Sequence, residues 1–231
     1  TRSKKKITSI PAAVTQISQE EILTGLPQLT LDEGLDITPG VFFQNQFNFA
    51  QDLRISIRGF GARSSFGVRG VKVLVDGIPQ TLPDGTTQLD SIDPGMIKNI
   101  EILRGPASSL YGNASGGIIS ITTEQNLEPK QRTEVGQFGL EKYQFKFGQV
   151  SGPLSYRIYT SHLKLNGYRD HSATENSFVH GVVKLTSKSH SEWKIIFSHF
   201  YSPKADDPGG LTQSEVESNP QKSSSNNIRF D

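Results

Sequence analysis

The chain has 231 residues, with 24 basic and 23 acidic side chains, so its formal net charge is only +1. This balance argues against a general polyanion binder, which usually carries a strong basic excess. The sequence has no cysteine, which excludes disulfides and thiolate metal sites. No run approaches about 18 uninterrupted apolar residues, so a transmembrane helix is excluded; a membrane β-barrel stays open because its alternating strands keep mean hydropathy low.

The first part of the chain combines short β-like runs with two helix-start signals. Residues 12–17 predict a strand. Two capping-box patterns, which begin at Ser18 and Thr30, predict short helices that end near Gly25 and at residues 38–40. A small α+β domain is therefore expected, with further extended segments at 41–43, 53–58, 71–75, 100–103 and 118–122, a loop at 44–51 and a turn at Asp76-Gly77.

The second part has a different character. Seven aromatic residues lie in residues 1–131 and thirteen in residues 132–231. Alternating strands are expected at 140–150, 154–166, 178–186 and 192–201, before a long polar loop at 203–227. Strands of this length match tilted membrane-spanning strands. Within residues 154–166 the apolar phase slips from Tyr156 and Ile158 to Leu163 and Leu165, which predicts a bulge.

Periodicity alone leaves a membrane barrel and a soluble antiparallel sheet equally open. Aromatic residues near the strand ends favour the barrel: Tyr143, Tyr168, Trp193 and Tyr201.

Four motifs in order carry a family resemblance. They are Ile57-Arg58-Gly59-Phe60, Val75-Asp76-Gly77-Ile78-Pro79, Ile100-Glu101-Ile102-Leu103-Arg104-Gly105-Pro106 and Leu110-Tyr111-Gly112-Asn113-Ala114-Ser115-Gly116-Gly117. They resemble the plug domain of TonB-dependent outer-membrane receptors. The resemblance implies an α+β plug domain at residues 1–126, followed at 127–231 by the first antiparallel strands of a transmembrane β-barrel, a truncated 22-stranded barrel. We expect the chain to be incomplete, without the family's signal peptide and TonB box.

The resemblance also implies roles for individual residues. Arg58 and Arg104 would lock the plug to carboxylates of the barrel wall, because a guanidinium binds a planar carboxylate through two parallel hydrogen bonds. The alternative is a pair of solvated arginines. Ligand contact would come from the outward loops 44–51, 61–69 and 79–88, with Gln46, Asn48, Phe49, Arg63, Ser65, Phe66, Arg69, Gln80 and Asp84 as candidates.

Arg63 and Arg69 suggest an anionic, carboxylate-rich ligand; the alternative is that both are loop arginines that merely face solvent. The segment 55–85 and the sequence Asp207-Pro208-Gly209-Gly210-Leu211 look most like receptors for ferric citrate and pyrroloquinoline quinone.

The implied function is high-affinity active uptake of a scarce nutrient, such as a ferric chelate, a siderophore or another carboxylate-rich cofactor. The expected partners are TonB with its inner-membrane energising complex, the extracellular nutrient and outer-membrane lipid, but no nucleic acid. We predict no catalytic residue, no metal site and no bound cofactor: the five histidines have no ligand spacing, and Gly59-Phe60-Gly61 lacks the third glycine of a dinucleotide loop. Two other hypotheses are a soluble plug-like binding module with an accessory sheet, and a colicin- or phage-type surface adhesion protein.

Overall fold

The computed structural model describes residues 13–44, 46–64, 67–82, 84–89, 91–105, 114–187 and 191–224. It divides into two compact units, and we describe each by itself. The first unit comprises Thr1–Phe47 and Asp52–Glu124, and the second comprises Asn48–Gln51 and Gln125–Asp231. The short segment 48–51 thus belongs to the second unit, although its neighbours in the chain belong to the first.

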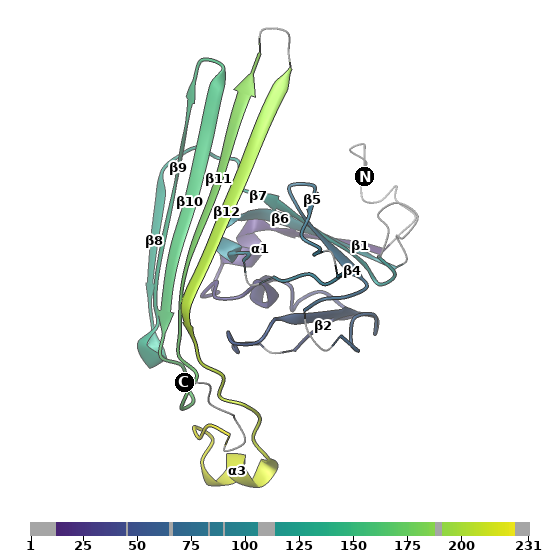
Figure 1. Ribbon diagram of the computed structural model, residues 1–231, viewed down its shortest axis with the longest axis vertical. Helices are drawn as coiled ribbons and strands as arrows, with labels where there is room; N and C mark the ends of the chain where they lie inside the picture. The colour runs from purple at the N-terminus through teal and green to yellow at the C-terminus, as the bar shows by residue number, and fades with distance from the viewer. Residues whose placement is uncertain are drawn as a thin grey trace. The chain divides into compact units, whose positions relative to one another are not determined.

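The first unit is built on a five-stranded mixed sheet (Figure 1). Its strands lie in the order β1-β6-β7-β4-β5, and only the β4–β7 pair is parallel. Isoleucines with no exposed surface, such as Ile102 and Ile119, form its core because alternate β-branched side chains pack on the same face. The strands are β1 (Ala13–Ser18), β4 (Val71–Val75), β5 (Ile78–Pro79), β6 (Ile97–Arg104) and β7 (Gly117–Thr123).

The turn between β4 and β5 follows from its two residues. Asp76 and Gly77 have φ angles of 50° and 83°, the positive values that a tight hairpin turn requires at both central positions. The Asp76 carboxylate also accepts the backbone N–H of Thr123 at 2.9 Å and its hydroxyl at 2.8 Å. This carboxylate therefore fastens the end of β7 to the end of β4.

Among its described residues, three short helices and a small hairpin complete the first unit. α1 (Gln19–Leu23) begins with the predicted capping box at Ser18. The second predicted helix is shorter than expected: η2 (Leu31–Gly34) is a single 3₁₀ turn, and the chain reaches Gly40 through turns. β2 (Val41–Gln44) pairs antiparallel with β3 (Arg54–Ile57), and η3 (Pro94–Met96) precedes β6.

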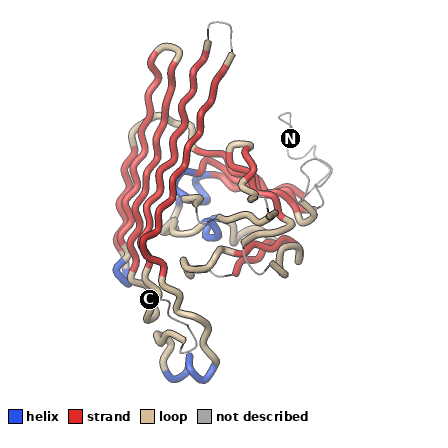
Figure 2. The backbone as a smooth tube through the Cα atoms, in the orientation of Figure 1, coloured by secondary structure: helices blue, strands red, loops and turns tan. Residues whose placement is uncertain are grey.

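The second unit is an antiparallel sheet of five strands in the order β12-β11-β10-β9-β8 (Figures 1 and 2). Three of its elements were not predicted: β8, the short helix η4, and helix α3 inside the expected polar loop. The elements are β8 (Lys130–Val135), η4 (Gln137–Gly139), β9 (Glu141–Ser151), β10 (Leu154–Leu165), β11 (Thr174–Thr186), β12 (Glu192–Ala205) and α3 (Gln213–Ser218).

The two faces of this sheet differ in polarity. The strand registers place large apolar side chains together on one face, which we call the apolar face, and many of them are exposed. Trp193 is 71% exposed and Ile195 is 65% exposed. The opposite face has several polar side chains, such as Lys142, Gln144 and Arg157. The apolar face comprises Tyr143, Phe145, Phe147, Leu154, Tyr156, Ile158, Val179, Gly181, Val183, Leu185, Trp193, Ile195 and Phe197, with some polar side chains among them.

Gly181 of β11 lies directly opposite Phe197 of β12. A Cβ atom on this glycine would clash with the ring of Phe197, so the ring occupies the space above the glycine. An aromatic ring that covers a cross-strand glycine protects the backbone at that position.

The prediction of a bulge within residues 154–166 is wrong. β10 pairs with both neighbours without interruption, so Leu163 and Leu165 simply lie on the opposite face from Tyr156. The irregularity is between β11 and β12, where the register shifts between Glu175 and Ser177. The extra residue is on β12 around Pro203, which fits a residue that cannot donate to the ladder.

No helix within the described ranges is long and apolar enough to cross a membrane. Several predicted features lie outside those ranges: residues 1–12, the candidates Ser65 and Phe66, the end of the third motif, the first half of the fourth, and His190.

Candidate functional site

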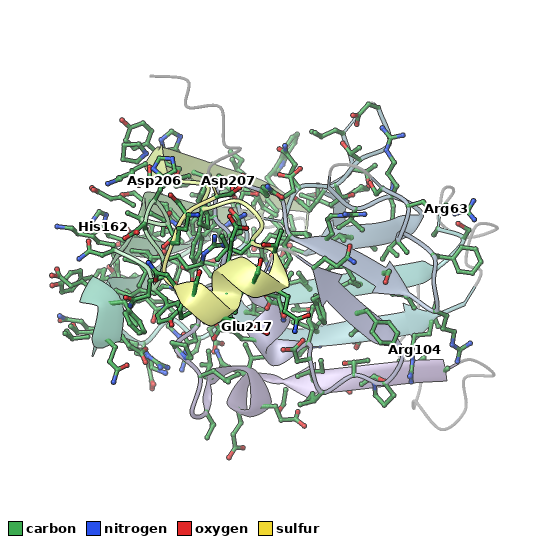
Figure 3. The ribbon with its side chains drawn as sticks, turned by 90° about the horizontal axis from the view of Figure 1, so that it is seen from below. Arg63, Arg104, His162, Asp206, Asp207 and Glu217 are labelled. Carbon is green, nitrogen blue, oxygen red and sulfur yellow. The ribbon has the colours of Figure 1, made fainter. Side chains whose placement is uncertain are left out.

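The two predicted lock arginines are both in the first unit. Arg104 donates from Nη1 to the Pro39 carbonyl at 2.7 Å and from Nη2 to Thr15 Oγ1 at 2.9 Å (Figure 3). Arg58 has a φ of 50°, donates its backbone N–H to the Gly40 carbonyl at 2.9 Å, and exposes its side chain. Neither forms an ion pair with a described residue, and their pairing with a barrel wall stays a prediction.

Two of the predicted ligand loops are joined to each other. Val68 and Thr87 exchange backbone hydrogen bonds of 3.0 Å in both directions, which holds loop 61–69 against loop 79–88. Gly67 makes this approach possible: its φ is 56°, and a Cβ there would lie 2.9 Å from the Thr87 carbonyl oxygen. The same junction brings Arg69 to 3.9 Å from Asp84, with side chains 57% and 59% exposed. An ion pair this open contributes little to stability.

The carboxylate of Asp84 is held by its own loop. It accepts the hydroxyl of Thr86 at 2.7 Å and the backbone N–H of Thr86 at 2.9 Å. These two hydrogen bonds lower the pKa of Asp84, and Arg69 adds to the effect. Asp84 is therefore an ionised, solvated group beside one of the two candidate arginines.

Arg63 and Gln80 form no hydrogen bond or ion pair with another predicted site residue that the structure describes. Arg63, labelled in Figure 3, is exposed and forms no ion pair in those ranges. The Gln80 amide donates to the Ile78 carbonyl at 3.2 Å. Within the described part of the chain, Arg63 is thus an exposed cation without an ion pair, whereas Arg69 is partly offset by Asp84.

Gln46 hydrogen-bonds two carboxylates that the sequence did not identify as candidate site residues. Its Nε2 atom donates to Asp32 at 2.8 Å and to Asp36 at 3.3 Å. Asp32 is 1% exposed, and its Oδ1 atom has no hydrogen-bond partner among the described residues. Burial raises the pKa of Asp36, the negative charge of Asp32 adds to the shift, and the Gln46 hydrogen bond opposes it. These contacts give Gln46 a structural partner instead of leaving its amide to a ligand.

Segment 48–51 is held by an aspartate of the loop that follows β12. Within the second unit, Asn48 Nδ2 donates to Asp207 Oδ1 at 3.0 Å, and Gln51 Nε2 donates to Asp207 Oδ2 at 2.8 Å. Gly209 donates its backbone N–H to the same Oδ1 at 2.9 Å. Burial raises the pKa of Asp207, but the hydrogen bonds from Gln51, Gly209 and Asn48 outweigh it, so the pKa is lowered. The candidate Phe49, which follows Asn48 in the chain, is half-buried.

Arg169 organises the same loop. Its guanidinium donates to the carbonyls of Pro208 at 3.0 Å, Gly209 at 2.6 Å and Lys222 at 2.9 Å. Ser224 N–H closes the loop onto the Pro208 carbonyl at 2.8 Å. Residues 206–224 are therefore a built structure with helix α3 inside it, not the featureless polar stretch that the sequence suggested.

The described histidines form no shared centre. His162 and His180 each bond a serine hydroxyl of the next strand through Nδ1, at 2.9 Å and 2.8 Å. No group of three or more His, Asp or Glu side chains in the described ranges could hold a metal ion.

Comparisons with known proteins converge on one family. Residues 6–118 match the family model of the TonB-dependent receptor plug domain. The pesticin receptor of Yersinia pestis is 34% identical over 120 residues, 51% of this chain and 17% of the receptor. Vitamin B12 transporter BtuB of Vibrio vulnificus (strain YJ016) is 29% identical over 188 residues, 77% of this chain and 29% of the transporter. The chain thus spans less than a third of the length of either relative.

The fold comparison extends past the plug. The crystal structure of unliganded ferric citrate transporter FecA superposes with a TM-score of 0.75 and 22% identity, over 92% of this chain and 34% of the transporter. TonB-dependent receptors are non-enzymatic proteins of the bacterial outer membrane. Residues 6–118 are thus a TonB-dependent receptor plug domain, and the five-stranded antiparallel sheet that follows matches part of the barrel of these receptors.

Proposed function

We propose that this chain is the plug domain and the first barrel strands of a receptor for active uptake of a scarce nutrient. The family assignment is the observation that supports transport. The apolar face of the β8–β12 sheet supports a membrane role, because a soluble accessory sheet would expose Trp193 and Ile195 to water. In this proposal the apolar face contacts outer-membrane lipid, and residues 1–126 and 127–231 are the plug and the barrel part.

The energy for uptake comes from TonB and its inner-membrane complex. Ligand contact at loops 44–51, 61–69 and 79–88 changes the population of plug conformations, because a ligand shifts an equilibrium by its difference in affinity for the two states. TonB then engages the loaded receptor. Arg58 and Arg104 hold the plug against carboxylates of the barrel wall.

The substrate we propose is anionic: a ferric chelate with a carboxylate-rich ligand, such as ferric citrate. Arg63 supports it as an exposed cation without an ion pair in the described ranges, and Arg69 is offset only by a long, solvated contact to Asp84. The relatives include receptors named for hemin and a transporter named for vitamin B12, so these ligands are the natural competitors. Pyrroloquinoline quinone is the carboxylate-rich alternative.

Uptake by cells that express the protein at its full natural length tests both levels of the proposal. Radiolabelled ferric citrate, hemin, cobalamin and pyrroloquinoline quinone are compared with and without TonB. We expect TonB-dependent uptake of a carboxylate-rich member of the panel, and a large loss of affinity for it in the Arg63→Ala/Arg69→Ala double variant. Uptake that does not need TonB contradicts the transport proposal. Unchanged affinity in the double variant contradicts the anionic substrate alone. A matched control is Lys72→Ala, which removes a cation from strand β4 instead of the loops.

A further inference from the structure

Asp207 connects two segments that are far apart in the sequence. Its Oδ1 atom accepts Asn48 Nδ2 at 3.0 Å, and its Oδ2 atom accepts Gln51 Nε2 at 2.8 Å, across separations of 159 and 156 residues. Both amides therefore bond the same carboxylate through different oxygens. Hydrogen bonds to a charged acceptor are stronger than neutral ones and fix the geometry of both donors.

The Asp207 carboxylate is also held by hydrogen bonds within its own loop. Gly209 N–H bonds Oδ1 at 2.9 Å, and Arg169 bonds the carbonyls of Pro208 and Gly209 next to it. Asp207 is thus anchored in loop 206–224. Within segment 48–51 itself, Ala50 N–H donates to Asn48 Oδ1 at 3.1 Å and Gln51 N–H donates to the Asn48 carbonyl at 3.3 Å.

We propose that Asp207 is a positioning residue for ligand binding: it fixes segment 48–51, the second half of the ligand-contact loop 44–51, on the loop that follows β12. The ligand part of this inference rests on the proposed function, whereas the positioning part does not. Asp207 acts through Asn48 and Gln51, so a ligand that contacts loop 44–51 meets side chains whose places depend on this carboxylate.

The decisive variant changes one atom of one amide. In Gln51→Glu a carboxylate faces Asp207 where the Nε2 donor was, and two like charges at this distance repel. Adding Asp207→Asn to the same chain restores a hydrogen bond with reversed roles. The amide introduced at position 207 donates to the carboxylate introduced at position 51, while its oxygen still accepts from Asn48 and Gly209. Lowering the pH to about 5 should also restore the contact in the Gln51→Glu variant, because its two facing carboxyl groups can then share a proton.

The positions are measured by the distance between spin labels at Ala50→Cys and Val216→Cys. Both sites are exposed, and the 231-residue sequence has no other cysteine. We expect a narrow distance distribution with native Gln51, a broad one for Gln51→Glu at pH 7.5, and a narrow one again with Asp207→Asn or at about pH 5. The protein is used at its full natural length in outer-membrane vesicles.

Asp206→Asn is the matched control (Figure 3). Asp206 lies next to Asp207 but contacts Lys204 at 3.5 Å and His171 at 3.9 Å. Asp206→Asn should therefore fail to restore the narrow distance distribution in the Gln51→Glu variant. A distribution that stays narrow in Gln51→Glu at pH 7.5, or equal rescue by Asp206→Asn, overturns the proposal.

Ferric citrate uptake supplies the second readout. We expect the KM of Gln51→Glu to rise about tenfold, equivalent to ~1.4 kcal/mol, with recovery in the Asp207→Asn double variant and an unchanged maximal rate. A broad distance distribution without any change in KM overturns the role in ligand binding. If the native protein takes up no ferric citrate, the proposed substrate fails, while the distance measurement still decides whether Asp207 positions segment 48–51.

Discussion

The two main sheets of this protein use similar side chains for opposite purposes. The sheet of β1, β6, β7, β4 and β5 buries its isoleucines, and Ile119 has no exposed surface. The β8–β12 sheet leaves Ile195 65% exposed and Trp193 71% exposed. An apolar side chain is thus a core residue in the first sheet and, in our interpretation, a lipid contact in the second. The comparison shows that side-chain type alone does not say which solvent a strand face meets.

The largest effect that would separate the two sheets is loss of a core isoleucine. Ile119→Ala should destabilise the first unit by about 2–5 kcal/mol, because it removes buried atoms and leaves a cavity between Ile102 and Val73, its partners on the two neighbouring strands. Amide hydrogen exchange of β6 and β7 measures it. Ile195→Ala is the control on the apolar face and should leave that exchange unchanged; equal effects of the two variants would contradict the distinction.

A charge on the apolar face tests the other half of the comparison. Ile195→Lys should make folding into a bilayer less favourable by about 2–4 kcal/mol, the range for a basic side chain near the membrane midplane. Ile195→Leu keeps the side chain apolar and serves as the control. Folding titrations into lipid vesicles provide the measurement. If lysine is tolerated as well as leucine, this face does not meet lipid.

The Asp76 contact sharpens the comparison within the first sheet. Asp76→Ala should cost about 1–3 kcal/mol, because two donors of Thr123 lose their acceptor. Asp76→Asn keeps one acceptor oxygen and tolerates the positive φ, so it should cost less. Hydrogen exchange of the β7 amides measures the loss of stability in each of the two variants. If the two variants lose the same stability, the Asp76 carboxylate does not stabilise the parallel pairing of β4 and β7.

The smallest effect at neutral pH concerns a region outside both sheets. The pKa of Asp207 is lowered, so the stability that it gives loop 206–224 is fully present above the ordinary aspartate range and is lost as the pH falls through the lowered value. Spin-label spectra at Val216 should therefore stay constant from neutral pH down to that range and then become more mobile. Asp207→Asn should remove the transition; a transition that persists would assign it to another group, such as Glu215, whose pKa is also lowered.

Much of the fold could be predicted because its signals are local. The capping box at Ser18 and the turn at Asp76-Gly77 are short patterns in which each residue type has one physical use, and both form as expected. Strand β8 was missed because five of its six residues, Lys130 to Glu134, are polar or charged and give no apolar alternation. Helix α3 could have been found: Thr212 and Glu215 form a capping box of the same kind as Ser18 and Glu21.

The candidate site was harder to predict because its contacts are not local. No pattern near Asn48 indicates that its partner is Asp207, since that pairing depends on how strands β8 to β12 bring a distant loop back. The same holds for Gln46 with Asp32 and Asp36. The sequence identified residue types suited to a polar ligand, but it could not tell which of them already bond within the protein.

Gly181 and Phe197 have a consequence for how this sheet tolerates change. Because the ring occupies the space that a Cβ would need, neither position can be altered without regard to the other. A larger residue at 181 requires a smaller one at 197, and loss of the ring uncovers a bare backbone. The two sites are therefore expected to covary in any library of functional variants, as a single unit of substitution that spans two strands.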